Sequence, residues 1–272
     1  MYLNSLDGMQ MNESLEALKK VIDECSQEER KELFQFLRAR LPLHPLEIEW
    51  AIDGDDVLSS LYRATDLSKR GVRGLIAEFV FERDVLPSVR ENGWKLVSIP
   101  KGDWPYDSLV ERDGKQASIQ IKLQRLEAGH PKRFWEKTYK DLVYYDVEVQ
   151  KTRTGKKRSP KGSAPSVEQQ ALPNSIDTRP YPFGAFDILA VNMQPATKKW
   201  SEFRFTVANW LLERPDSPSL IEIHQPVALI PDNAWTDNLS TCLEWFLRGE
   251  DKKILEEIRH KPRPRKKNGS SS

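Results

Sequence analysis

A short hairpin near the middle of the chain gathers residue types that could carry out chemistry. Asp113-Gly114 is the strongest short signal for a two-residue hairpin turn, and it separates two predicted strands, 106–112 and 115–123. In such a hairpin each step back along one strand matches a step forward along the other. This pairing places Asp107 directly opposite Gln120.

The side chains of this hairpin divide into a polar and an apolar face. Successive side chains of a strand point to opposite faces, so Gln120 and Lys122 share one face with Asp107 beside them. The apolar residues point to the other face: Ile119, Ile121 and Leu123. We therefore expect an acid, an amide and a lysine to converge on one side of a buried stripe.

This combination suits metal-dependent hydrolysis of a phosphodiester. Asp107 and the amide oxygen of Gln120 can hold Mg²⁺, helped by the backbone carbonyl of Ile121. The metal would polarise the phosphate and lower the pKa of a bound water, while Lys122 would orient that water and offset the developing charge. The same spacing also fits an ordinary surface hairpin with its polar residues outward, so the hairpin alone does not decide.

The elements that must position these residues follow from hydrophobic spacing. Residues 12–63 read as a helical region. The predicted order after it is a helix from 72 that closes at Pro87 or Asn92-Gly93, strands at 95–99, 106–112 and 115–123, a helical stretch at 131–142, strands at 144–150, 186–192 and 203–212, and a helix at 239–246. This order indicates an α/β or α+β fold with a mixed central sheet flanked by helices.

One part of the chain resembles a known superfamily. The segments Trp104-Pro105-Tyr106-Asp107 and Ser118-Ile119-Gln120-Ile121-Lys122, behind a helix that carries Gly74-Leu75-Ile76-Ala77-Glu78, resemble the PD-(D/E)xK nucleases, which include many type II restriction endonucleases. The resemblance covers about residues 70–150 and extends to 192 if the later strand belongs to it. It implies a restriction-endonuclease-like αβββαβ core whose last strand is either 144–150 or 186–192.

By position, the resemblance also implies roles for individual residues. Glu78 matches the acidic residue of the first helix, Asp107 the metal-binding aspartate, and Gln120 with Lys122 the last motif. The implied catalytic set is Glu78, Asp107, Gln120 and Lys122, and the implied Mg²⁺ ligands are Glu78, Asp107, Gln120 and the Ile121 carbonyl.

The implied activity is Mg²⁺-dependent endonucleolytic cleavage of double-stranded DNA, of the type II restriction class. A two-fold homodimer would cut both strands of a palindromic site with one active site per subunit, and a cognate DNA methyltransferase would accompany the enzyme. Gln120 departs from the family pattern because it removes one negative charge from the metal site. Two alternatives therefore stay open: an inactive DNA-binding protein on a nuclease scaffold, and an α/β interaction protein with a basic tail.

A rival constellation lies on the next predicted strand. Alternation puts Asp146, Glu148 and Gln150 on one face ahead of Lys151. The hairpin is the preferred site because it has the upstream helix that the chemistry needs. Asp187, ahead of a buried strand, either adds a polar group at the sheet edge or caps the strand.

Charge and composition divide the chain into regions. We expect a helical N-terminal region at 1–66, a nuclease-like core at 67–249 with a basic insertion at about 151–182, and a basic tail at 250–272. The net charge of the 272 residues is only +1, yet the insertion has a dense group of basic residues. These candidate DNA-backbone contacts are Lys151, Arg153, Lys156, Lys157, Arg158 and Lys161.

Several classes of protein are excluded by what the sequence lacks. There is no P-loop, dinucleotide fingerprint, nucleophile elbow or zinc-protease motif, and the four histidines are scattered. No apolar run is long enough for a membrane span, and no signal peptide is visible at the N-terminus. With two distant cysteines, Cys25 and Cys242, a cytoplasmic location is expected.

Overall fold

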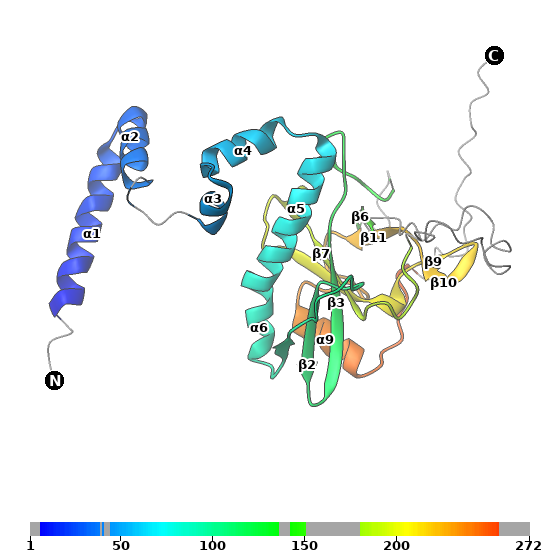
Figure 1. Ribbon diagram of the computed structural model, residues 1–272. Helices are drawn as coiled ribbons and strands as arrows, with labels where there is room; N and C mark the ends of the chain where they lie inside the picture. The colour runs from blue at the N-terminus through cyan, green and yellow to red at the C-terminus, as the bar shows by residue number, and fades with distance from the viewer. Residues whose placement is uncertain (1–5, 39, 41–43, 136–141, 151–179, 256–272) are drawn as a thin grey trace, which may run out of the picture. The chain divides into compact units, whose positions relative to one another are not determined.

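The computed structural model describes residues 6–38, 40, 44–135, 142–150 and 180–255 (Figure 1). Contacts divide the chain into two units, Met1–Lys69 and Arg70–Ser272. No helix in the described ranges is long and apolar enough to cross a membrane.

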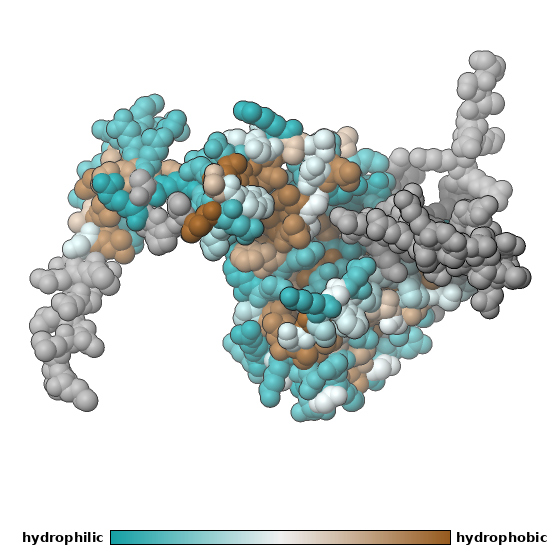
Figure 2. Space-filling model, in the orientation of Figure 1, coloured by the Kyte–Doolittle hydropathy of each residue, from teal (hydrophilic) through white to brown (hydrophobic). Residues whose placement is uncertain are grey.

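The first unit is helical, as the sequence predicts for 12–63. Its helices are α1 (Leu6–Glu24), α2 (Gln27–Arg38), α3 (Pro45–Trp50) and α4 (Gly54–Arg63). α4 starts after Asp53, whose side chain accepts a hydrogen bond from the Asp55 amide. α2 and α4 bury no residue, and their apolar surface contributes to the brown areas of Figure 2.

A nearly continuous helical segment begins in the last residues of the first unit and continues into the second. It consists of α5 (Asp66–Val80), a π-helical turn (Phe81–Val85) and α6 (Leu86–Arg90). Pro87 was one of two predicted end points, but the helical segment continues through it, because α6 follows the π-helical turn directly and Pro87 lies in its first turn. The segment closes instead at Gly93, whose φ of 81° is readily adopted only by glycine.

The second unit is built on a five-stranded mixed sheet of order β1-β2-β3-β7-β8. The strands are β1 (Lys95–Val97), β2 (Ser108–Arg112), β3 (Lys115–Leu123), β7 (Ile188–Asn192) and β8 (Phe203–Val207). β3 and β7 are parallel, and the other pairs are antiparallel. The predicted mixed central sheet is thereby confirmed, although the strand expected at 203–212 ends at Val207.

The predicted hairpin between β2 and β3 is confirmed with its register. Asp113 and Gly114 have φ angles of 53° and 74°, as a two-residue turn with two positive φ values requires. Ser108 faces Ile119 across the ladder. Asp107 lies one step beyond, where its amide donates to the Ile119 carbonyl at 2.9 Å.

Helices and sheet share one hydrophobic core. Helix α9 (Leu239–Leu247) packs against β8 and β7, close to its predicted extent. Phe81 of the π-helical turn lies 5.7 Å from Phe203 and 6.4 Å from Phe205, both of β8, between ring centroids. These contacts fix the end of α5 against the sheet.

The predicted strand at 144–150 is shorter and belongs elsewhere. β6 (Tyr144–Glu148) pairs with β11 (His224–Ala228) in a separate two-stranded ribbon, and the two lie side by side in Figure 1. The strand parallel to β3 is β7, so the second of the two predicted candidates for the last core strand is the right one.

The predicted helix at 131–142 is wrong for the residues described. β5 (His130–Pro131) pairs with β4 (Leu126–Glu127), and Arg133 bridges to Tyr145. Lys132 also exchanges backbone hydrogen bonds with strand segments, which satisfies the groups that a helix would use. Residues 136–141 lie outside the described ranges.

The remaining elements are short. They are α8 (Gln194–Thr197), a 3₁₀ turn at Ala208–Trp210, β9 (Glu213–Arg214) and β10 (Ser217–Ile221).

Candidate active site

Three parts of the chain bring the four predicted catalytic side chains together at β3, the central strand of the sheet. Glu78 comes from the last turn of α5, Asp107 precedes β2, and Gln120 and Lys122 lie on β3. Each of the two carboxylates influences the charge of Lys122, so the groups are electrostatic neighbours. The convergence arises because the hairpin register fixes Asp107 while core packing fixes α5.

Asp107 is held firmly by its partner strand. Its Oδ2 atom accepts a hydrogen bond from the Ile121 amide at 2.7 Å and another from Gln120 Nε2. Gln120 Nε2 also donates to the Ile121 carbonyl at 3.2 Å. The Gln120 amide therefore bridges two of the predicted metal ligands, and its side chain is only 3% exposed.

Burial and like charge shift the protonation of the acids. Burial, with the Asp107 carboxylate second, raises the pKa of Glu78 to about 7. Burial also raises the pKa of Asp107, against the lowering effect of its hydrogen bond from the Ile121 amide and of Lys122. The Asp107 carboxylate thus disfavours the charged form of Glu78, which is the electrostatic situation that a cation relieves.

Lys122 is shifted in the opposite sense. Burial lowers the pKa of its ammonium group, while Asp107, Glu78 and Glu148 favour the charged form. A partly buried lysine among carboxylates has the position and charge to contact an anionic phosphate oxygen.

The oxygen donors of this site fit a hard divalent cation. Glu78 and Asp107 offer carboxylate oxygens and Ile121 a backbone carbonyl, the ligand types that Mg²⁺ prefers. Gln120 supplies a fourth oxygen once its amide turns, because Nε2 now points at Asp107 and Ile121. Among described residues no cluster of three or more His, Cys, Asp and Glu is arranged for a metal, so carboxylates alone would not complete the site.

Two neighbours of this site were not predicted as part of it. Lys122 Nζ lies 5.8 Å from the centroid of the Tyr181 ring, and burial together with Asp107 and Asp103 raises the pKa of Tyr181 to about 12. Glu148, assigned to the rival constellation, is close enough to affect Lys122. No spacing signal pointed to Tyr181, since it follows a long polar segment.

The other predicted residues are located as follows. Asp146 and Glu148 of the rival strand lie on β6, whereas Lys151 falls outside the described residues. Asp187 directly precedes β7, and its carboxylate accepts hydrogen bonds from the Ser118 amide and hydroxyl at 2.8 and 2.7 Å, which agrees with the strand-capping alternative. The basic residues predicted to bind DNA all lie outside the described ranges: Lys151, Arg153, Lys156, Lys157, Arg158 and Lys161.

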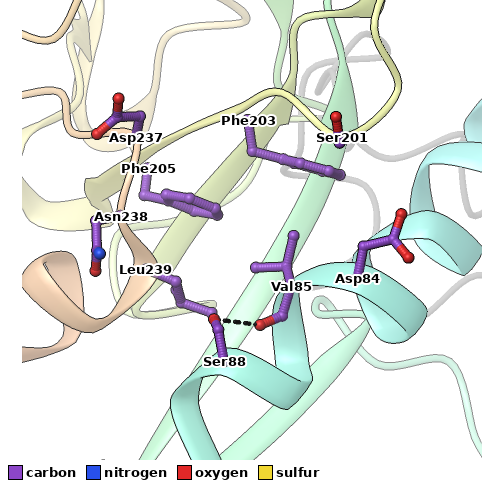
Figure 3. Close-up of a pocket in the computed structure, with 9 residues that line it drawn as sticks. All are labelled: Asp84, Val85, Ser88, Ser201, Phe203, Phe205, Asp237, Asn238 and Leu239. Atoms are coloured by element: carbon purple, nitrogen blue, oxygen red, sulfur yellow. Dashed lines mark hydrogen bonds between the residues drawn. The ribbon is translucent and has the colours of Figure 1, made fainter.

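A pocket of about 140 Å³ lies elsewhere in this unit (Figure 3). Phe203, Phe205 and Val85 form its apolar part, and Asp84 and Asp237 stand at its edges. None of the four catalytic candidates lines it. The candidate active site at β3 is therefore separate from this pocket.

Comparison with known proteins gives one distant similarity. A solved structure of a bacterial homing endonuclease, I-Ssp6803I, is similar at 17% sequence identity and a TM-score of 0.30, over 60% of this chain and 79% of that one. No family model and no curated protein matches the chain. A TM-score this low does not establish a common fold, so the interpretation of the site depends on its own geometry.

Proposed function

We propose that the chain is a Mg²⁺-dependent endonuclease that hydrolyses phosphodiester bonds in double-stranded DNA. The observation that carries the proposal is the convergence of Glu78, Asp107, Gln120 and Lys122 at the central strand β3. The resemblance of these segments to the PD-(D/E)xK motif supports the same assignment.

Each residue has a distinct task in the proposed reaction. Asp107, Glu78, Gln120 and the Ile121 carbonyl would hold the cation, which when bound polarises the phosphodiester and lowers the pKa of water. Lys122 would contact a non-bridging phosphate oxygen and offset the charge that builds up there. In the metal-free protein the pKa of Glu78 is about 7, so Glu78 would give up its proton when it binds the cation.

The finer proposal is a type II restriction endonuclease. It would act as a homodimer on a palindromic site, with a DNA methyltransferase as its companion and residues 151–161 along the DNA backbone. A methyltransferase gene beside the gene for this chain would support this biological role.

An inactive DNA-binding protein is the second candidate, and one observation favours it. The Gln120 amide already satisfies Asp107 and the Ile121 carbonyl, so these oxygens have partners without a cation. Mg²⁺-dependent cleavage of a plasmid separates the two candidates, since the inactive protein would bind the DNA without cutting it.

The proposal is tested by two substitutions in the full-length chain. We expect Asp107→Ala and Lys122→Ala each to slow plasmid cleavage by about 10²-fold or more, because one removes a ligand and the other a charge stabiliser. Binding to the same DNA, measured by fluorescence anisotropy without divalent metal, should change little.

Lys115→Ala is the matched control, since this exposed lysine lies at the other end of β3. It should cleave at the wild-type rate. Wild-type cleavage by either site variant would overturn the assignment.

A further inference from the structure

A second polar cluster lies on the ribbon of β6 and β11 and is not used in the proposed reaction. We call Lys132, Asp146 and His224 the Asp146 cluster. Asp146 is 3% exposed and stands at its centre. A buried carboxylate is costly unless cationic or hydrogen-bonding groups surround it, so the surrounding groups are informative.

One carboxylate holds both basic side chains. His224 Nδ1 lies 3.0 Å from Asp146 Oδ1 and 3.1 Å from Oδ2. Lys132 Nζ lies 3.5 Å from the same Oδ2 atom. The imidazole and the ammonium group are thereby fixed next to each other.

The bases are more open to solvent than the acid that holds them. The side chains of Lys132 and His224 are 26% and 34% exposed, against 5% for Asp146. Within the described residues His224 Nε2 has no hydrogen-bond partner. Lys132 also contacts Glu127 at 3.4 Å, on the exposed rim of the cluster. The Asp146 carboxylate is thus buried, while donors of Lys132 and His224 are open to solvent beside the exposed Glu127 carboxylate.

The cluster adjoins the candidate active site through Glu148. His224 faces Glu148 directly across the β6–β11 ladder. Glu148 pairs with Arg125 at 3.2 Å and favours the charged form of Lys122. Within the described residues, the charged groups next to His224 include Asp146 and Glu148 of β6, with Lys132 and Arg125 bound to them.

We propose that Lys132 and His224 form a phosphate-binding site beside the cleavage centre. When both nitrogens of His224 carry protons, Nδ1 donates to Asp146 and Nε2 donates to a phosphate oxygen. Lys132 donates to the same group from its third hydrogen, since Asp146 and Glu127 take the other two. The ligand is a backbone phosphate of the nucleic-acid strand that also reaches Lys122. The inference rests on the proposed function in one respect, namely that the bound strand is the DNA to be cleaved.

The test measures binding of a short fluorescent duplex to the full-length chain without divalent metal. We expect His224→Gln and Lys132→Gln each to weaken binding about tenfold, the effect of losing a hydrogen bond to a charged group. Lys132→Gln should also lower the slope of log affinity against log salt by about 0.9. Lys115→Gln, at the far end of β3, should change neither quantity.

Asp146→Asn tests whether Asp146 positions Lys132 and His224 or only reduces the positive charge of the cluster. If Asp146 positions the two bases, its removal weakens binding even though the protein becomes more positive. Tighter binding would overturn the positioning role. Thermal unfolding followed by circular dichroism checks that the variant is folded, and His224→Gln tests the site independently if it is not.

Inorganic phosphate separates the two possible sources of the ligand. The imidazole resonances of His224 are followed by NMR with phosphate, with chloride at equal ionic strength, and with duplex. A shift with duplex alone supports a backbone contact, and a shift with both supports a general phosphate site. No shift with either, or unchanged duplex affinity in both Gln variants, overturns the inference. If the Gln variants weaken duplex binding as expected but the wild-type chain does not cleave plasmid, only the proposed nuclease activity is refuted.

Discussion

Glu78 makes the candidate metal site sensitive to pH. Its pKa of about 7, raised from 4.5 chiefly by burial, means that the carboxyl group is protonated below neutral pH. A cation must displace this proton, so apparent Mg²⁺ affinity should fall as pH drops from 8 to 6. In Glu78→Gln the affinity should be weaker and this part of the pH dependence should vanish, as measured by isothermal titration calorimetry.

The same shift predicts the stability of the metal-free protein. The folded state binds the Glu78 proton more tightly than the unfolded chain, so wild-type stability falls as pH rises from about 4.5 to 7. Glu78→Gln avoids this loss and should melt a few degrees above wild type at pH 8, with no such gain at pH 4. An equal difference at both pH values would contradict the assigned shift.

Substitutions of Gln120 distinguish an active nuclease from the inactive DNA-binding protein. Gln120→Glu places an anionic oxygen beside Asp107 and should tighten Mg²⁺ binding, because hard cations favour anionic oxygens. The added buried charge should also lower stability without metal. Gln120→Leu keeps the approximate volume, removes the ligand and should abolish cleavage while the chain stays folded.

Calorimetry for the metal, plasmid cleavage and circular dichroism check these outcomes. Full cleavage by the Leu variant would show that Gln120 is no ligand. The strand that carries Asp146 and Glu148 would then be the better candidate.

At the scale of elements, Asp187 fastens β7 to β3. Its carboxylate accepts two hydrogen bonds from Ser118, and its own amide donates to the Ser118 carbonyl at 2.9 Å. Asp187→Ala leaves a buried strand amide without its partner and should lower the free energy of unfolding by about 2 kcal/mol. Urea unfolding measures the loss, and Asp251→Ala, which changes a largely exposed carboxylate, is the control.

The contacts between Asp187 and Ser118 also affect the candidate active site, because Gln120 lies two residues after Ser118 on β3. A loosened β3–β7 pair would leave the position of Gln120 less defined. If Asp187→Ala were as stable as the Asp251→Ala control, the parallel pairing would not depend on these contacts.

At the scale of the whole molecule, the basic segment 151–161 carries the prediction for DNA affinity. Replacing Lys156, Lys157 and Arg158 by Ala should weaken binding to all sequences alike. Each lost phosphate contact should lower the slope of log affinity against log salt by about 0.9. Anisotropy titrations at several salt concentrations measure this slope, and an unchanged slope would show that the segment makes no contact with DNA.

The sequence by itself determined the features that depend on neighbouring residues. The Asp113-Gly114 turn and the alternation along β3 fixed the register that sets Asp107 opposite Gln120, because hairpin pairing is a local property. Helical spacing in the first 63 residues was readable for the same reason.

Only the tertiary structure decided which distant segments meet. It paired β3 with β7 and placed β6 on a ribbon with β11, although both β6 and β7 read as strands. It also brought Tyr181 to Lys122 and His224 to Asp146, and raised the pKa of Glu78. The physical reason is that burial, charge and strand pairing between residues far apart in sequence arise from packing of the whole unit, which no local pattern encodes.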